Sequence, residues 1–263
     1  MKAAAQTGVL WRVVTTHMPT KWGMFRATGY EREFANGIAR VETALAIVMG
    51  DLPQDVPLLR IHSRCFTGEA LGSLRCDCAN QLSMAMQAIA EEGRGLVIYE
   101  YQEGRGIGLM AKLEAYELQD AGLDTVEANH ALGFKSDYRD FSLPVAILRD
   151  LGVSRVRLLT NNPRKVRALS DAGIEIAAQI PCEPAATPHS FRYLRTKKEK
   201  MGHALTLRNH VGTGDREIEC IREFAPDLEP RGHYPEEIFI LPCGEYRHAI
   251  DAAGRARGIE SQL

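Results

Sequence analysis

Apolar residues recur along this chain in two periods, one typical of buried strands and one typical of amphipathic helices. Short apolar runs predict strands at residues 58–62, 95–99, 156–160 and 174–180. The helical period predicts helices at residues 82–92, 109–119, 143–151 and 163–173. Because strand, loop and helix alternate in this order, the pattern predicts an α/β domain.

The two ends of the chain depart from this alternation. Residues 1–57 mix short apolar runs with turns, and residues 191–208 are locally basic, which is typical of a solvated helix face. After them come glycine and several prolines, and then an alanine- and arginine-rich end. We therefore expect one domain over residues 1–208 and a C-terminal appendage over residues 209–263.

The composition is that of a soluble globular protein. Hydrophobic residues make up 45% of the 263 residues and charged residues 25%, with a formal net charge of −2. This balance does not suggest nucleic acid or a membrane as a partner, so local arginines and lysines must meet any anionic ligand. No apolar run reaches membrane-spanning length and the first residues lack a signal-peptide core, so we expect a cytoplasmic protein.

Six cysteines are too few for a disulfide scaffold in a chain of this length, and three of them are clustered. Cys65 follows a predicted strand, and Cys76 and Cys78 lie in one loop. Thiolates are strong zinc ligands, and catalytic zinc sites pair three protein ligands with one open position. Three buried free thiols are the alternative. The Cys-x-Cys spacing in a polar loop favours the metal site.

Three further polar segments lie where a ligand could bind. Residues 102–108 form a glycine-rich loop between a strand and a helix, which suits either an anion or a plain turn. Residues 124–140 are dense in polar side chains, as in a surface loop or a binding site. Asn161 and Asn162 follow a strand and begin a helix, where they can contact a ligand or cap the helix.

Together these motifs resemble the GTP cyclohydrolase II family of riboflavin biosynthesis, from about residue 10 to residue 203. The matching stretches are Arg-Ile-His-Ser-x-Cys-x-Thr-Gly (60–68), Leu-Arg-Cys-Asp-Cys (74–78), Gln-Glu-Gly-Arg-Gly-Ile-Gly-Leu (102–109), Ala-Tyr-x-Leu-Gln-Asp (115–120), Asp-Thr-Val-Glu-Ala-Asn (124–129), Leu-Gly-Phe-x-x-Asp-x-Arg (132–139) and Leu-Leu-Thr-Asn-Asn-Pro-x-Lys (158–165).

Members of this family open the imidazole ring of GTP and release formate and pyrophosphate, giving 2,5-diamino-6-ribosylamino-4(3H)-pyrimidinone 5′-phosphate. The resemblance implies a mixed sheet with flanking helices and a homodimer. It also implies one zinc ion per chain on Cys65, Cys76 and Cys78, which would activate the water that attacks C8, and magnesium on the triphosphate.

The resemblance also implies catalytic roles for three residues. Tyr116 would position or protonate groups during ring opening. Arg139 matches the residue assigned as nucleophile on the α-phosphorus, and Asp137 matches its proton acceptor. Stabilisation of the leaving pyrophosphate is a physically easier role for Arg139, because the pKa of arginine exceeds about 12.

Twelve positions match nucleotide contacts of the family. Glu103 has the chemistry to accept hydrogen bonds from the guanine N1–H and amino group, whereas Arg105 and Lys165 suit phosphates. The full set is Arg60, Ile61, His62, Ser63, Arg64, Gln81, Glu103, Gly104, Arg105, Thr125, Thr160 and Lys165.

The chain departs from the family pattern at three positions. Arg64 replaces the usual glutamate, Tyr101 the usual arginine and Ala79 the usual glycine. We expect positions 64 and 101 to face each other, with Arg64 paired to the neighbouring Glu100. Because Arg64 and Tyr101 lie near the nucleotide site, the alternatives to GTP ring opening are another purine nucleotide, a formylated product, or a catalytically silent nucleotide-binding homologue.

Overall fold

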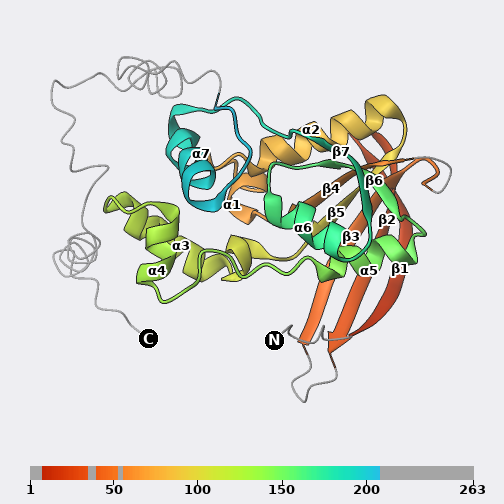
Figure 1. Ribbon diagram of the computed structural model, residues 1–263, viewed down its shortest axis with the longest axis horizontal. Helices are drawn as coiled ribbons and strands as arrows, with labels where there is room; N and C mark the ends of the chain where they lie inside the picture. Colours follow the sequence, from red (N-terminus) through yellow and green to blue (C-terminus); the bar gives the residue numbers. More distant parts are fainter. Residues whose placement is uncertain (1–7, 35–39, 53–55, 208–263) are drawn as a thin grey trace, which may run out of the picture.

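The computed structural model describes residues 8–34, 40–52 and 56–207, and the predicted appendage lies outside these residues. The described residues form a seven-stranded sheet in the order β1-β2-β3-β5-β4-β6-β7 (Figure 1). The strands are β1 (Val9–Thr20), β2 (Gly23–Phe34), β3 (Arg40–Met49), β4 (Leu58–Ser63), β5 (Gly95–Glu100), β6 (Arg155–Leu159) and β7 (Glu175–Ile180). The helices are α1 (Phe66–Glu69), α2 (Cys78–Glu92), α3 (Leu109–Asp120), α4 (Thr125–Ala131), α5 (Ser142–Asp150), α6 (Pro163–Asp171) and α7 (Pro188–Met201), with a 3₁₀ turn η1 (Glu103–Gly106).

The sheet combines an antiparallel half with a parallel half. β1, β2, β3 and β5 pair as antiparallel neighbours, whereas β5, β4, β6 and β7 run parallel to one another. Parallel strands bring their carboxyl ends to one edge of a sheet, which is where ligands bind in open α/β folds. The segments that follow β4, β5 and β6 therefore meet at this edge, and they carry the polar motifs of the sequence.

Each face of the sheet builds its own core because successive side chains of a strand point to opposite faces. In β5, Leu96 and Ile98 pack with residues of α5 and α6, whereas Val97 packs with residues of α2. Figure 1 shows α2 on one side of the parallel strands and α5 with α6 on the other. The two cores fix the strands whose carboxyl ends carry the polar segments.

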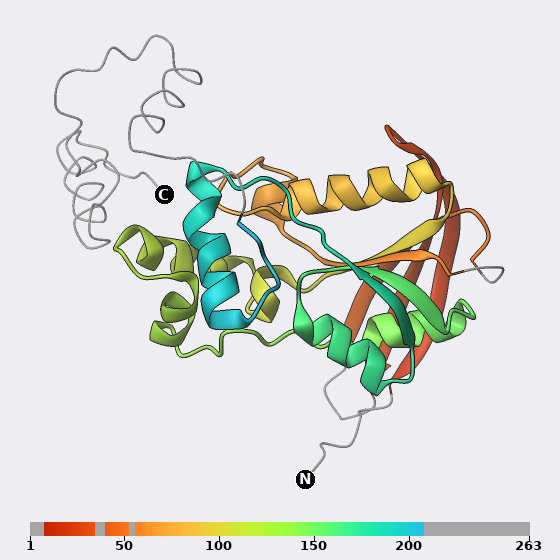
Figure 2. The same ribbon diagram turned by 45° about the horizontal axis from the view of Figure 1, so that its top comes forward.

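Helices α3, α4 and α7 form a separate group at the end of the molecule away from β1 and β2 (Figures 1 and 2). α4 packs against both α3 and α7. It begins at a capping box in which Asp124 accepts from the backbone of Glu127 and the Glu127 side chain accepts in return.

Among the described residues, no helix combines the length and the apolar content that a membrane crossing needs.

The α/β prediction and its mixed sheet are confirmed, as are the eight predicted elements, which correspond to β4–β7 and to α2, α3, α5 and α6. Their bounds differ by a few residues; α2, for example, begins at Cys78 instead of Leu82. The long hairpin of β1 and β2 was not predicted, because most of its β1 side chains are exposed and show no alternation of burial. Nor was α4, whose sequence was interpreted as a polar loop or site.

Candidate active site

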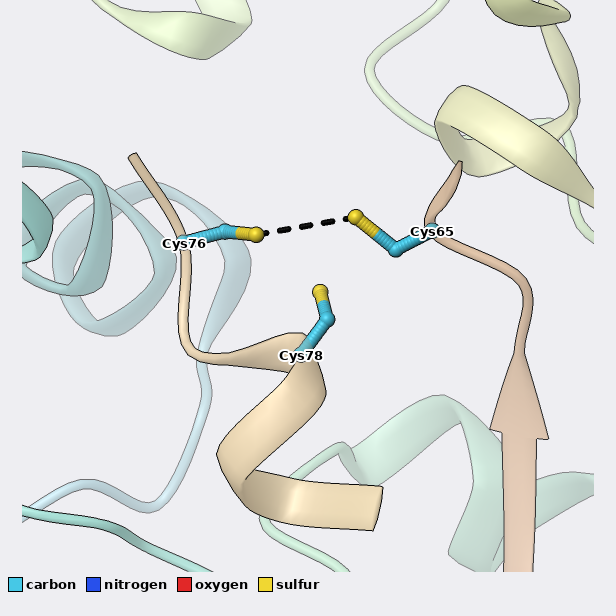
Figure 3. A group of neighbouring side chains, drawn as sticks. All are labelled: Cys65, Cys76 and Cys78. Atoms are coloured by element: carbon cyan, nitrogen blue, oxygen red, sulfur yellow. Dashed lines mark hydrogen bonds between the residues drawn. The ribbon is translucent and has the colours of Figure 1, made fainter. Parts of the chain in front are cut away.

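The three cysteines of the predicted metal site come together at the carboxyl edge of the sheet. Cys65 follows β4, Cys76 lies in the loop before α2, and Cys78 is the first residue of α2. Their sulfur atoms lie within 4.8 Å of one another and point toward a common centre (Figure 3). The Sγ atoms of Cys65 and Cys76 are 3.6 Å apart. The predicted grouping of the three thiols is therefore confirmed.

The short helix α1 holds this geometry. The Cys65 backbone N–H donates to Glu69 Oε1 at 2.9 Å, and the same carboxylate binds Nε2 of His62 at 2.8 Å and the hydroxyl of Tyr99. A Cβ atom at Gly68 would lie 3.0 Å from Sγ of Cys76, closer than side chains normally approach. The turn is thus anchored through one carboxylate and leaves no room for a side chain beside the sulfurs.

The three thiols share their negative charge unequally. Hydrogen bonds with Cys76 and Cys78 lower the pKa of Cys65 far below its usual range, and the Lys112 ammonium, 3.2 Å from Cys65 Sγ, lowers it further. The same contact with Cys65 raises the pKa of Cys76 to about 11. A divalent cation stabilises all three thiolates together, so this cluster suits a bound metal better than it suits three neutral thiols.

The donor set and its spacing fit zinc. Tetrahedral Zn–S bonds of about 2.3 Å place sulfur atoms about 3.8 Å apart. The observed separation of 3.6 Å between Cys65 and Cys76 is close to that value. Three thiolates leave one coordination position for a water or a substrate atom, and all three cysteines line a cleft from which such a ligand can enter.

The cleft consists of two adjoining hollows of about 580 and 540 Å³. We call the first the thiol hollow, because it contains Cys65, Cys76 and Cys78, and the second the cation hollow. The residues that line both are Ser63, Cys78, Arg105, Arg139 and Tyr193. The other sequence-predicted residues in the thiol hollow are Arg64, Cys65, Cys76, Glu103, Gly104, Tyr116 and Thr125. Those in the cation hollow are Arg60, His62, Gln81, Thr160 and Lys165.

Five basic side chains of the described residues line the cation hollow: Arg60, Arg105, Arg139, Lys165 and Lys197. No acidic residue of the described chain lines it. Burial, together with the charges of Arg60 and Arg139, lowers the pKa of Lys165 well below its usual range. Burial also lowers the pKa of His62 to about 4, so this ring is neutral at pH 7. A hollow with this excess of positive charge attracts an anion such as a phosphate chain.

Ile61 and Asp137 are the two predicted site residues that line neither hollow. The side chain of Ile61 lies in the core, and its carbonyl oxygen accepts a hydrogen bond of 2.7 Å from Lys165 Nζ. Asp137 lies behind Arg139 and accepts from its Nε at 3.0 Å and from its Nη2 at 2.8 Å. Both therefore act on the cleft through a neighbouring cation.

The Asp137 carboxylate is poorly suited to accept a proton. Burial alone would raise its pKa, but hydrogen bonds from Arg139, the charge of Arg139 and the charge of Arg164 together lower that pKa to about 2. In return, Asp137 raises the pKa of Arg139 above its usual value despite burial. This geometry argues against the implied proton acceptor and nucleophile, and it favours a fixed guanidinium held by a carboxylate.

Tyr116 projects into the thiol hollow from α3. Its hydroxyl lies 3.2 Å from Thr67 Oγ1, which in turn lies 3.8 Å from Cys65 Sγ. Burial raises the pKa of Tyr116 to about 12. The phenol is therefore protonated at pH 7 and can donate a hydrogen bond or a proton close to the metal site.

The glycine-rich loop forms the turn η1 with two consecutive left-handed residues. Gly104 has φ 60° and Arg105 has φ 61°, a conformation that costs energy for a residue with a side chain. Arg105 is thereby aimed into the cleft, where its buried Nη2 has no hydrogen-bond partner among the described residues. An unpaired buried guanidinium donor of this kind suits a phosphate oxygen.

Both carboxylate oxygens of Glu103 hold neighbouring groups, while the residue also lines the thiol hollow. Its Oε2 accepts from the Phe66 backbone N–H at 2.7 Å, and its Oε1 accepts from Lys112 Nζ at 2.7 Å. The side chain is almost completely buried. Glu103 therefore positions α1 and Lys112, and its role toward guanine stays a prediction, since each carboxylate oxygen can accept a further hydrogen bond.

The two departures from the family pattern do face each other. The Arg64 guanidinium lies 5.3 Å from the centre of the Tyr101 ring and 4.0 Å from Glu103 Oε2. The expected ion pair with Glu100 is wrong, because the Glu100 side chain points into the protein and accepts from Gln102 at 2.7 Å. Alternation along β5 explains this, since Glu100 and Tyr101 cannot point the same way.

Three polar cleft residues in or just after α7 were missed, because they lie within the segment interpreted as a solvated basic face. Tyr193, Lys197 and His203 all line the cation hollow. The solvated-face interpretation is right for Lys198 and wrong for Lys197. Asn162 was expected either to contact a ligand or to cap a helix. It caps α6, since its side chain accepts from the Arg164 backbone N–H at 2.9 Å.

Comparison with known proteins adds to this geometry. The sequence model of the GTP cyclohydrolase II family matches residues 11–181. GTP cyclohydrolase-2 from Shigella boydii serotype 18 is 53% identical over 195 residues, which covers 74% of this chain and 97% of that protein. GTP cyclohydrolase-2 from Escherichia coli O9:H4 has the same identity and coverage. Among solved structures, the comparison finds RibBX from A. baumannii, a two domain 3,4-dihydroxy-2-butanone 4-phosphate synthase. The two chains are 21% identical with a TM-score of 0.39, and the match covers 66% of this chain and 40% of the RibBX chain. No argument is based on this weak match.

We predict that the purified protein contains about one zinc ion per chain and that Cys76→Ser removes most of it, because a hydroxyl is a poor zinc ligand beside two thiolates. Metal content by atomic emission is the measurement. Cys182→Ser is the matched control, since Cys182 is a buried thiol outside the three-sulfur group. Unchanged zinc in the Cys76 variant would rule out the three-cysteine site.

Proposed function

The chain belongs to the GTP cyclohydrolase II family, and we propose that it is a zinc-dependent cyclohydrolase that opens the imidazole ring of GTP. The proposed products are formate, pyrophosphate and 2,5-diamino-6-ribosylamino-4(3H)-pyrimidinone 5′-phosphate. One observation carries the proposal: a three-thiol cluster adjoins a hollow lined by five cations and no acid among the described residues. A purine nucleotide has the matching halves, since its ring can approach a metal while its phosphates meet the cations.

We assign the two halves of the nucleotide to the two hollows of the cleft. The phosphates occupy the cation hollow, where Arg60, Arg105 and Lys165 supply charge. The imidazole end of the purine enters the thiol hollow and approaches Cys65, Cys76 and Cys78. Activation of a water molecule near neutral pH is the chemistry that bound zinc supplies there.

Tyr116 and Arg139 then act at opposite ends of the nucleotide. The protonated Tyr116 hydroxyl donates to the ring atoms as the C8–N bond breaks. Arg139, held by Asp137, stabilises charge on the departing pyrophosphate. This division follows from the hollows, because Tyr116 lines only the thiol hollow and Arg139 lines both.

Three further features belong to the same proposal. Magnesium enters bound to the triphosphate. No acidic side chain of the described residues lines the cation hollow, so the hollow offers no carboxylate ligand for magnesium in the absence of a nucleotide. The active form is a homodimer, as the family resemblance implies. The protein works in the cytoplasm, where thiols such as Cys65 and Cys76 stay reduced.

We expect the zinc-loaded protein to convert GTP with magnesium into formate, pyrophosphate and the diaminopyrimidine, each followed by mass spectrometry. Removal of zinc with a chelator should abolish formate and the diaminopyrimidine, because zinc acts at the ring, whereas pyrophosphate release should fall less. A product that retains the formyl group would support the alternative chemistry, and ATP or another purine nucleotide turned over in place of GTP would support altered specificity. Binding of GTP without any turnover would favour the silent homologue.

Arg139→Ala and Tyr116→Phe should fail in different ways. Loss of Arg139 removes charge from the phosphate end, so pyrophosphate release should fall by about a hundredfold or more. Loss of the Tyr116 hydroxyl should lower formate release by a similar factor while pyrophosphate release falls less. Separate assays of formate and pyrophosphate give the ratio of the two products for each variant. Equal loss of both products in both variants would contradict this division of roles.

Arg64 and Tyr101 should behave as a coupled pair. Arg64→Glu places a second carboxylate near buried Glu103, so kcat/KM for GTP should fall about tenfold. Adding Tyr101→Arg supplies a cation opposite the new carboxylate and should recover most of the loss. Measurement of kcat/KM for both single variants and for the double variant completes a double-mutant cycle. Additive effects would show that the two departures do not compensate each other.

A further inference from the structure

Lys197 is a buried cation of the cleft that lies beyond residues 11–181, the segment matched by the family model. It comes from α7, which Figure 2 shows beside the start of α2 and across from α3. Its neighbour Lys198 is exposed, as the basic sequence of this helix predicts. Lys197 differs because the helix turns it inward, where its side chain is only 12% exposed.

The Lys197 ammonium has N–H donors without an acceptor among the described residues. Its Nζ contacts Asp77 Oδ1 at 2.8 Å and lies 4.3 Å from the centre of the Tyr193 ring. An ammonium carries three N–H donors, and Asp77 is its single hydrogen-bonded acceptor among the described residues. Lysine is almost never buried with unmet donors in a protein interior. Because Lys197 lines the cation hollow, a ligand bound there can accept from the remaining donors.

Asp77 connects this lysine to the rest of the site. It lies between the two thiol residues Cys76 and Cys78, and its Oδ2 accepts from Gln81 Nε2 at 2.6 Å. Gln81 Oε1 accepts in turn from Arg60 Nη2 at 2.5 Å. The carboxylate of Asp77 therefore supports Lys197 from behind, away from the hollow, as Asp137 supports Arg139.

We propose that Lys197 binds a phosphate group of the substrate directly, so that α7 is a wall of the active site and not a surface helix. The inference deepens the proposed function by assigning one phosphate-binding residue to it. The ligand class is an inorganic or nucleotide polyphosphate, because five cations of the described residues converge on a hollow without acids. The competing interpretation is that Lys197 serves only as a partner that holds Asp77 and the thiol loop in place.

Binding of inorganic pyrophosphate with magnesium to the zinc-loaded full-length protein, measured by titration calorimetry, tests the proposal. Lys197→Met keeps a long unbranched side chain on Tyr193 but removes the charge, and Kd should rise about tenfold or more. Zinc content and melting temperature should stay near those of Lys198→Met, the exposed neighbour, whose Kd should equal that of the wild type.

Asp77→Asn separates the two interpretations. It weakens the ion pair but leaves the Lys197 cation in the hollow, so pyrophosphate affinity should be retained within about threefold. Equal losses of affinity and zinc in Lys197→Met and Asp77→Asn would overturn direct binding and establish the supporting role. An unchanged pyrophosphate affinity in Lys197→Met would also overturn direct binding by Lys197.

The result is independent of GTP turnover. A protein that binds pyrophosphate through Lys197 but leaves GTP intact would refute the proposed function and keep this inference. A wild-type protein that opens GTP yet shows no binding of pyrophosphate would refute the inference and keep the function.

Discussion

The burial of positive charge at one edge of the sheet is the constraint on which this site depends. The basic side chains of Arg139, Lys165 and Lys197 each lie largely out of bulk water. Isolated burial of such charges costs several kcal/mol each. The fold offsets this cost with acceptors placed behind the cations: Asp137 for Arg139, the Ile61 carbonyl for Lys165 and Asp77 for Lys197. Because these acceptors point away from the cavity, the hollow itself stays positive.

The same arrangement couples the phosphate end of the cleft to the thiol end. Asp77 lies between two of the cysteines and also pairs with Lys197 from α7, so this ion pair connects the thiol loop to a helix far along the chain. Glu69 fixes Cys65 from the other side through its backbone N–H. The elements that carry the sulfurs are therefore in direct contact with the elements that carry the basic side chains, so the two halves of the site adjoin.

The sequence alone predicted the parallel half of the sheet and the thiol cluster, because both depend on local patterns. Apolar runs such as residues 95–99 and the Cys-x-Cys spacing need no knowledge of distant contacts. It could not predict that Lys197 turns inward while Lys198 stays in water, since both lie in one basic run and only packing of α7 distinguishes them. Nor could it predict that the Glu103 oxygens accept from the Phe66 backbone and from Lys112, since both contacts depend on the packing of α1 and α3.

The departures from the family pattern affect only one half of this assembly. Arg64 lines the thiol hollow and stacks on the half-exposed Tyr101, while neither residue lines the cation hollow. Every cation that the family resemblance assigns to phosphates is present and buried or half-buried in the cation hollow. A change in ligand preference caused by Arg64 and Tyr101 would therefore act on the purine ring and its approach to the thiols. Recognition of the phosphate chain would be left as it is, because the basic side chains proposed to determine it, Lys197 among them, line the cation hollow.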